Sequence, residues 1–392
     1  MTPLEQISPT EVGARLRLAR EEANVTQADA GTAIGVARTT IVAMEQGQRR
    51  ARIAELQNLA KLYRTSVNAL LRRESVHADL APRFRKLPGN QAEAEAAAEL
   101  MADLAKAEVE LENLLGIQRT HNYPPERPIL RGDVRVQAEQ DAAELRQRLG
   151  LGNGPVSDIV TLLEMEMGIR VYVRRFDGRI SGLFAYDDTL GACMLLNANH
   201  PRERRTNTAG HETGHFISTR RRPEILRVDE EENSREEKYA NAFARAFLTP
   251  SRAVMQKFQE IIAGSDRLTR RHVIILAHFF GVSREAIVRR LEELGSVKPG
   301  TWDWFQGNGG ITDEQARQVL GDLSAPDAGK LEADRPTTLR LNSLAEEVYR
   351  RGLLSEGQLA RLLRLDRVEL RTILSSQEPE GGEADGALNL PD

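Results

Sequence analysis

The stretch TNTAGHETGHFIS, residues 206–218, places two histidines four positions apart, with a glutamate directly after the first. Positions i and i+4 of an α-helix share one face, so His211 and His215 can offer imidazole nitrogens to one metal ion while Glu212 lies beside them. The chain holds only seven histidines, which makes this spacing uncommon by chance. In the alternative interpretation, the two histidines only cap and pack an ordinary helix. The stretch therefore predicts a metal site on a helix.

A zinc site of this kind needs a third protein ligand and an open position for water. The segment REEKYANAFARAFLTP, residues 235–250, predicts another amphipathic helix, on which Glu237 follows His215 by 22 positions. The apolar residues of that helix would pack it and hold a carboxylate near the first helix. Glu236 is the nearest rival, whereas the acidic run at residues 229–232 is typical of a solvated surface.

The chemistry of such a site follows from charge. A zinc ion lowers the pKa of its bound water toward about 7. Glu212 would take the proton of that water as it attacks a carbonyl carbon, and would act first as base and then as proton shuttle. The sequence thus predicts Zn2+ as cofactor, Glu212 as the catalytic residue, and three metal ligands: His211, His215 and Glu237.

The segments before the motif predict a small α+β domain. Two helices are expected over residues 138–149 and 155–167, followed by three strand-like runs between turn sequences. The runs are IRVYVRR, ISGLFAYD and GACMLLNA, and the turns are FDGR and DDTLG. We expect a small antiparallel sheet that precedes the helix with the two histidines.

These motifs also carry a resemblance. GHETGH resembles the AHELGH of the ImmA/IrrE family of bacterial and phage metallopeptidases, and EKYANAFARAFLTP resembles the family's ExxANxFAxxLLxP, over roughly residues 135–295. The second match selects Glu237 over Glu236 as third ligand. Thr213 replaces the family's usual apolar residue, and Gly210 its usual alanine. The resemblance implies a gluzincin-like zinc endopeptidase that cuts a cognate repressor or antitoxin and so switches on stress, prophage or mobile-element genes.

A second motif, VTQADAGTAIGVARTTIVAMEQGQRR, spans residues 25–50. Thr26 suits the N-cap of a first helix, Gly35 supplies a turn, and a second helix would run from Ala37 to Gly47. This is the pattern of a helix-turn-helix within a bundle of five short helices. The expected core residues are Leu16, Ala28, Ala33, Val36, Ile41, Met44, Leu56 and Leu59. The expected DNA-binding residues are Gln27, Arg38, Thr39, Thr40, Gln46, Arg49 and Arg50.

Charge and resemblance both favour DNA as the partner of this segment. Residues 1–86 carry 14 Lys and Arg against 9 Asp and Glu, whereas the rest of the chain carries 40 against 49. TQADAGTAIGVARTTIVAMEQG also resembles the TQxxxAxxxGVxxxTIxxxExG pattern of the Cro/repressor-type (XRE) helix-turn-helix family, over about 60 residues. Short helix pairs also occur in protein-binding bundles, which is the alternative interpretation.

The helix predicted over residues 91–117 links the two motifs. Its heptad-like seam suits either pairing with a second copy in a homodimer or packing against a neighbouring domain. The seam residues are Leu100, Leu104, Ala107, Leu111 and Leu114. Two later segments, RHVIILAHFFGVSREAIVRRLEELG and LSEGQLARLLRLDRVELRTIL, each predict a pair of helices around a short turn.

Composition completes the prediction of a mainly α protein. No apolar run of about 18 residues and no secretory signal are seen, and Cys193 is the single cysteine, so we expect a cytoplasmic protein without membrane segments, disulfides or thiolate metal sites. Five regions are expected: a helix-turn-helix domain at 1–75, a helical linker at 76–134, a metallopeptidase domain at 135–295, a helical region at 296–376 and a disordered acidic tail at 377–392.

We therefore expect a DNA-binding regulator joined to a zinc endopeptidase, with an operator duplex and a cognate repressor or antitoxin as partners. The alternative is a non-catalytic transcription factor whose protease-like domain senses a ligand or mediates dimerisation.

Overall fold

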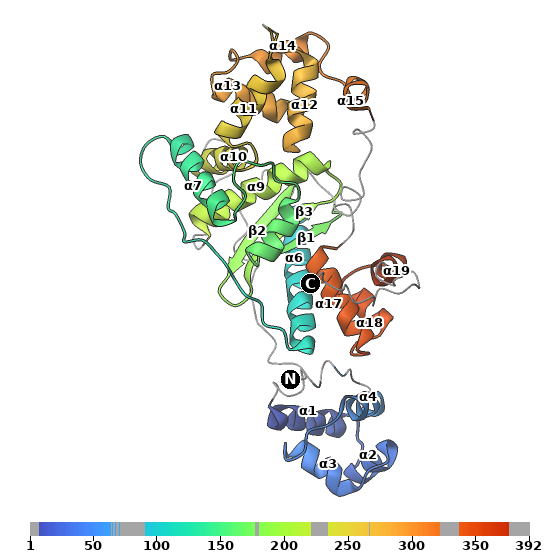
Figure 1. Cartoon of the computed structure of the whole chain (residues 1–392). Coiled ribbons are helices and arrows are strands. Elements are labelled where there is room, and N and C mark those ends of the chain that lie inside the picture. Colours follow the sequence, from blue (N-terminus) through green and yellow to red (C-terminus); the bar gives the residue numbers. More distant parts are fainter. Residues whose placement is uncertain are drawn as a thin grey trace, which may run out of the picture. The chain divides into compact units, whose positions relative to one another are not determined.

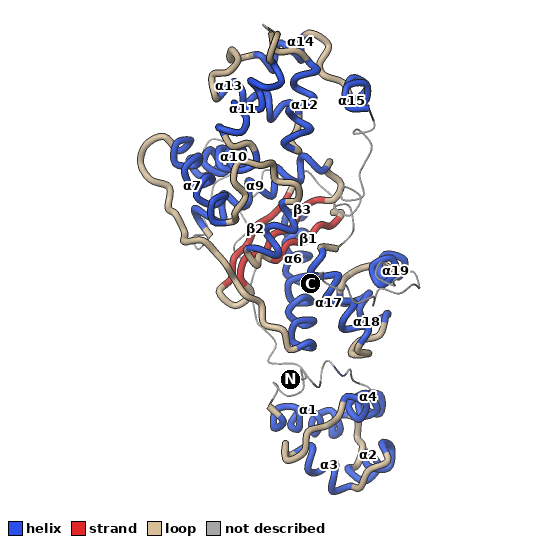
Figure 2. Tube along the Cα trace, in the orientation of Figure 1, coloured by secondary structure: helices blue, strands red, loops and turns tan. Residues whose placement is uncertain are grey.

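The computed structural model describes residues 8–63, 65, 67, 70, 91–176, 180–220, 234–265, 267–321 and 337–375. In these ranges the chain is mainly helical with one small sheet, as predicted (Figures 1 and 2). Its contacts divide it into two compact units. The first comprises Met1–His77, Lys106–Arg119 and Leu339–Asp392, and the second comprises Ala78–Ala105 and Thr120–Thr338. No described helix is long and apolar enough to cross a lipid bilayer.

The first unit begins with the predicted helix-turn-helix. The Thr26 hydroxyl accepts a hydrogen bond from the Asp29 amide at 3.1 Å and so starts the second helix. Gly35 ends that helix with a φ of 70°, a conformation that costs glycine little. Most of the fifth predicted helix lies outside the described residues. The four helices are α1 (Pro9–Glu22), α2 (Gln27–Ile34), α3 (Arg38–Glu45) and α4 (Ile53–Leu62).

The core of this helical domain differs from the prediction on one helix. Ala28 and Ala33 are exposed, because α2 turns Ala30 and Gly31 inward instead. Val36 is half-buried. The other predicted core residues are buried: Leu16, Ile41, Met44, Leu56 and Leu59.

The linker helix α6 (Gln91–Leu115) is more buried than a simple spacer would be. Four of the five predicted seam residues are at most 3% exposed within a single chain: Leu104, Ala107, Leu111 and Leu114. Leu100 is half-buried. Packing within the chain thus occupies this face, and a homodimer stays a prediction.

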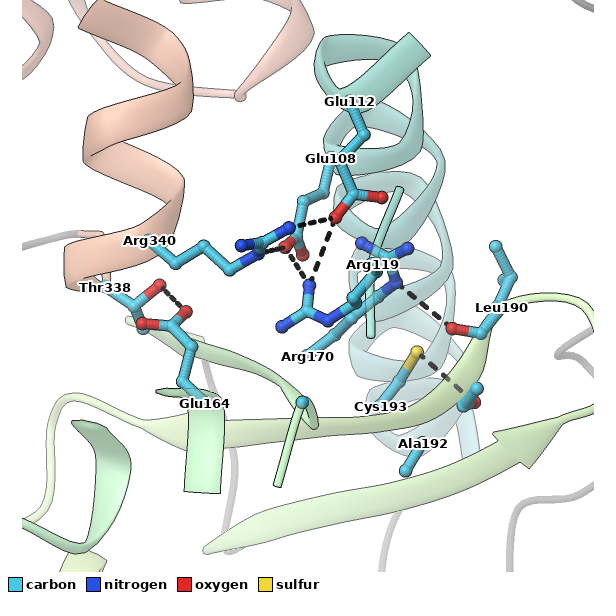
Figure 3. A network of polar contacts seen from close by, with 12 residues as sticks. Glu108, Glu112, Arg119, Glu164, Arg170, Leu190, Ala192, Cys193, Thr338 and Arg340 are labelled. Carbon is cyan, nitrogen blue, oxygen red and sulfur yellow. Dashed lines mark hydrogen bonds and ion pairs between the residues drawn. The ribbon is translucent and has the colours of Figure 1, made fainter. Parts of the chain in front are cut away.

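Buried charges on α6 are neutralised within the first unit (Figure 3). Glu108 and Glu112 have side chains only 2% and 6% exposed, and both form ion pairs with Arg119 and Arg340. The Arg340 guanidinium lies 2.9 Å from Glu112, and buried carboxylates need such partners. Arg340 belongs to α17 (Leu339–Arg350), so this cluster anchors the first turn of that helix on α6.

The second unit contains a sheet of three strands in the order β1-β3-β2. Strand β1 pairs in parallel with β3, and β2 pairs antiparallel with it, so the sheet is mixed and not antiparallel as predicted. The strand sequences do not predict this mixed sheet. Strand β3 lies between β1 and β2, so the chain places β2 at the far edge and then returns to form β3 beside β1, parallel to it. The strands are β1 (Arg170–Arg174), β2 (Gly182–Asp187) and β3 (Gly191–Asn197).

Helix α9 (Arg202–Thr219) packs against β2 and β3 of this sheet (Figure 1). The helix expected over residues 155–167 is instead one short helical turn, α8 (Ile159–Thr161), followed by a π-helical turn, η3 (Leu162–Glu166). The remaining helices of the unit are α7 (Val134–Arg148), α10 (Arg235–Leu248), α11 (Ser251–Ile262), α12 (Arg270–Phe280), α13 (Arg284–Glu293), α14 (Thr301–Gly307) and α15 (Asp313–Leu320).

Candidate metal centre

The helices α9 and α10 approach closely because small residues face each other between them. A Cβ atom added to Gly214 would lie 2.9 Å from the Cα of Ala240, closer than side chains pack, so this contact requires glycine. One turn earlier, the position of Gly210 faces Ala244, with the added Cβ at 3.3 Å from the Ala244 Cβ. The histidine-bearing face of α9 therefore meets the first turns of α10 directly.

Three side chains converge at this contact. The Nε2 atoms of His211 and His215 lie 3.0 Å apart, and the two carboxylate oxygens of Glu237 lie 3.2 and 3.3 Å from them. His211 and Glu237 keep 18% and 19% of their side-chain surface exposed, so solvent reaches the group.

This donor set fits a tetrahedral metal ion. Two imidazole nitrogens and a carboxylate are ligands that zinc takes in catalytic sites, and ligand atoms about 2.0–2.2 Å from a tetrahedral ion lie roughly 3.3–3.6 Å from one another. The observed separations of 3.0 to 3.3 Å come close to that spacing. Among the described residues, the three form a group that could hold a metal ion.

The close approach of His211, His215 and Glu237 also shifts the pKa values of His211 and Glu237. Burial disfavours the charged form of His211, but the hydrogen bond that its ring donates to Glu237 and the charges of Glu212 and Glu237 outweigh burial and raise its pKa. Burial likewise works against ionisation of Glu237, yet its hydrogen bonds with His211 and His215 lower its pKa well below the usual range. The carboxylate of Glu237 is thus ionised at neutral pH and ready to act as a ligand.

Glu212 lies next to the ligands on α9. It is half-buried, and its charge acts on His211. The neighbouring Thr213 is fully buried, and its hydroxyl donates to the carbonyl of Ala209 at 2.7 Å. The threonine that replaces an apolar residue here therefore has its polar group satisfied within the helix.

Several contacts fix α10 in the orientation that presents Glu237. Ser234 caps the helix by accepting a hydrogen bond from the Glu237 amide at 3.1 Å. The Tyr239 hydroxyl donates to the buried carboxylate of Asp141 at 2.7 Å, which ties α10 to α7. At the other end, the Arg146 guanidinium donates to the Phe247 carbonyl at 2.5 Å. Glu237 is thus held from both ends of its helix.

Glu236, the nearest rival ligand, is not in this group. Glu236 is half-buried on α10 but does not join the three ligand atoms. The acidic run at residues 229–232 lies outside the described residues.

Family models match two separate segments of the chain. Residues 164–292 match the model of the IrrE N-terminal-like domain, a peptidase family, and residues 11–73 match that of a helix-turn-helix domain. The chain joins these two domains. No curated protein matches the chain. The helix-turn-helix domain indicates a DNA-binding regulator, and the IrrE-like domain indicates a protease-like function.

The helix-turn-helix domain exposes most of its predicted DNA-binding residues, but two of them are engaged inside the domain. Gln27 donates to the buried carboxylate of Glu45 at 2.9 Å, and Arg49 pairs with Glu55 at 2.8 Å. Thr40 is half-buried. The exposed residues are Arg38, Thr39, Gln46 and Arg50.

In the IrrE-like domain, one functional candidate was missed by the sequence reasoning. In the tautomer that leaves the Nε2 lone pair of His211 for a metal, its Nδ1–H donates to the side-chain oxygen of Asn241 at 3.1 Å. Asn241 follows Glu237 by four positions on α10, so the two share a helix face. That spacing is the signal by which it could have been found.

Replacing Asn241 by alanine should lower the metal affinity of the chain about 10- to 100-fold, because the ring of His211 loses the acceptor that orients it. Chelator competition with a metal-sensitive dye measures this affinity. Asn241→Asp retains an oxygen acceptor and should bind metal nearly as well as the unaltered chain. Equal affinities for Asn241→Ala and the unaltered chain would show that this hydrogen bond orients nothing.

Proposed function

We propose that the chain is a cytoplasmic DNA-binding regulator whose IrrE-like domain is a zinc-dependent endopeptidase. Its substrate would be a cognate repressor or antitoxin, and the cut would derepress stress or mobile-element genes. The observation that carries this proposal is the convergence of the His211 and His215 Nε2 atoms with the Glu237 carboxylate at 3.0 to 3.3 Å, beside Glu212.

In this proposal His211, His215 and Glu237 hold the ion. When bound, zinc supplies positive charge that polarises a peptide carbonyl and brings the pKa of water toward about 7. The Glu212 carboxylate then accepts a proton from the attacking water and passes it to the amide nitrogen that leaves. His211 is kept in the required orientation by Asn241.

The direct test is cleavage of a defined protein. The purified chain, supplied with zinc, is incubated with DNA-binding proteins encoded near its own gene, and fragments are identified by mass spectrometry. We expect one of these proteins to be cut at a discrete peptide bond, with no cleavage after chelation. Intact partners under all conditions would contradict the endopeptidase proposal.

The DNA half of the proposal assigns base and phosphate contacts to the start of α3. Arg38 and Thr39 are exposed at its first two positions, where a recognition helix enters the major groove. Gln46 and Arg50 are exposed just beyond its end and suit contacts to the backbone of the duplex.

Arg38→Ala should weaken binding to the operator by about 1 to 3 kcal/mol if Arg38 contacts a base edge. Fluorescence anisotropy on the operator and on a scrambled duplex separates the two contact types, since loss of a phosphate contact weakens both duplexes alike. Arg17→Ala is the matched control, because Arg17 is exposed on α1 and pairs with Glu21 at 2.9 Å. Unchanged operator affinity for Arg38→Ala would remove Arg38 from the interface.

A further inference from the structure

The C-terminal helices repeat the helix-turn-helix of the N-terminal domain without a gap. TQADAGTAIGVARTTIVAME, residues 26–45, aligns with SEGQLARLLRLDRVELRTIL, residues 355–374. The second segment forms α18 (Glu356–Leu362) and α19 (Arg367–Ser375). Ser355 caps α18 by accepting a hydrogen bond from an amide three residues on, at 3.3 Å, as Thr26 does for α2 at 3.1 Å.

The turns between the helices are also equivalent. Gly35 has a φ of 70°, and Arg364 at the same aligned position has a φ of 50°, which is uncommon for a residue with a side chain. The next residue in each motif donates its amide to the carbonyl five positions earlier, at 2.9 Å in both cases. The left-handed turn is therefore retained although its glycine is replaced.

The buried positions match as well. In each motif three aligned side chains are at most 3% exposed. In each case the helix that precedes the motif packs on the second helix of the motif: α1 packs on α3, and α17 packs on α19. The pairs are Ala30 with Leu359, Ile41 with Leu370, and Met44 with Ile373. Helices α17, α18 and α19 thus form a three-helix module with its own core, defined here as the C-terminal module.

The C-terminal module has a small excess of cationic side chains, although Arg340 pairs with Glu108 and Glu112 on α6. Residues 337–375 carry seven arginines, no lysine and five acidic residues. Arg367 is exposed at the first position of α19, where α3 has Arg38, and Arg361 is exposed on α18.

The two acidic residues near the start of α19 are turned back on its backbone. The Asp366 carboxylate accepts from the amides of Val368 and Glu369 at 2.8 Å, and the Glu369 carboxylate accepts from the Asp366 amide at 3.2 Å. Both carboxylates therefore serve as helix caps. Arg367 is left as the cationic side chain that projects from the first turn.

We propose that the C-terminal module is a second DNA-binding helix-turn-helix, with α19 as its recognition helix and Arg367 in contact with the duplex. The N-terminal helix-turn-helix domain is the first DNA reader, and the C-terminal module would be a second one in the same chain. The competing occupant of the α19 face is a protein, and the test below distinguishes the two.

The test uses the full chain and a fluorescent duplex at low salt. Binding by the unaltered chain is measured first, then binding by a chain whose first reader is silenced with Arg38→Glu and Arg50→Glu. We expect the silenced chain to keep salt-dependent binding to the duplex, because Arg361 and Arg367 of the C-terminal module can still contact phosphates. Adding Arg367→Glu should then weaken the remaining binding by at least about 10-fold.

Arg350→Glu in the silenced chain is the charge-matched control, since Arg350 is exposed at the end of α17 and pairs with Glu347. It should change the remaining affinity by less than about 2-fold. Circular dichroism checks that each variant is folded. Equal losses for the two variants would reduce the effect to net charge and overturn the proposed contact.

Two further outcomes also decide the matter. Binding by the unaltered chain but none by the silenced chain would overturn the second reader alone and leave a protein as the competing occupant of the α19 face. Absence of DNA binding by the unaltered chain would overturn both this inference and the DNA half of the proposed function.

Discussion

A His211→Ala/His215→Ala variant should purify with no stoichiometric metal, whereas the unaltered chain should carry about one zinc ion. The double change removes both nitrogen donors and leaves the Glu237 carboxylate as the sole ligand of the trio, which is too few for a catalytic zinc site. Elemental analysis of protein purified without added zinc measures the ratio. The expected effect is complete loss of the ion, the largest change that we predict for any variant.

Two controls make this result specific. His272→Ala/His278→Ala also removes two histidines, both half-buried on α12, and should leave the metal content unchanged. Glu237→Ala should lose the ion while Glu236→Ala keeps it, because only the first carboxylate meets the imidazoles. Stoichiometric zinc in the His211→Ala/His215→Ala variant would refute the assigned ligands.

Glu212→Gln should keep the metal and lose cleavage of the partner by a factor of about 10² to 10⁴, because glutamine cannot accept the proton of the attacking water. The same variant should bind its operator like the unaltered chain, since the helix-turn-helix domain is untouched. In cells we expect it to fail to derepress its target genes. Transcript levels and the abundance of the intact partner measure these effects.

The matched control for Glu212→Gln is Glu203→Gln, a change of the same kind in the first turn of the same helix, remote from the ligands. It should retain both cleavage and derepression. If the Glu212→Gln strain regulates its genes as the unaltered strain does, catalysis is irrelevant to regulation. The IrrE-like domain would then act as a sensor or a dimerisation element.

Local features of this protein could be predicted from its sequence, whereas features that depend on non-local packing could not. Thr26 and Gly35 predicted the helix-turn-helix because capping and a left-handed turn depend on neighbouring residues. The four-residue spacing of His211 and His215 predicted two donors on one helix face, and the resemblance of EKYANAFARAFLTP to the family pattern selected Glu237 over Glu236 as the third. The cap, the left-handed turn and each of the two ligand-bearing motifs are encoded within a few turns of chain.

Non-local packing decided the rest. The direction of β1 relative to β3 depends on how a connection crosses the sheet, and the alternating strand patterns contain no such information. Ala28 and Ala30 are chemically identical, so only the orientation of α2 against its neighbours determines which of them is buried. The hydrogen bond between His211 and Asn241 likewise depends on the contact between α9 and α10, so the spacing of Asn241 from Glu237 could suggest the residue but not the bond.

The three ligand side chains come from two separate helices, so a bound ion would link these helices. Two donors come from α9 and one from α10, so the ion would cross-link two helices that are otherwise joined at this point by packing and by the hydrogen bond between His211 and Asn241. A ligand that binds only the folded state adds to stability through mass action, by about 2.7 kcal/mol when its free concentration is 100 times its dissociation constant. With zinc as the proposed ion, folding of the IrrE-like domain would be coupled to the supply of free zinc, and a zinc-depleted cell would hold less of this domain in its folded state.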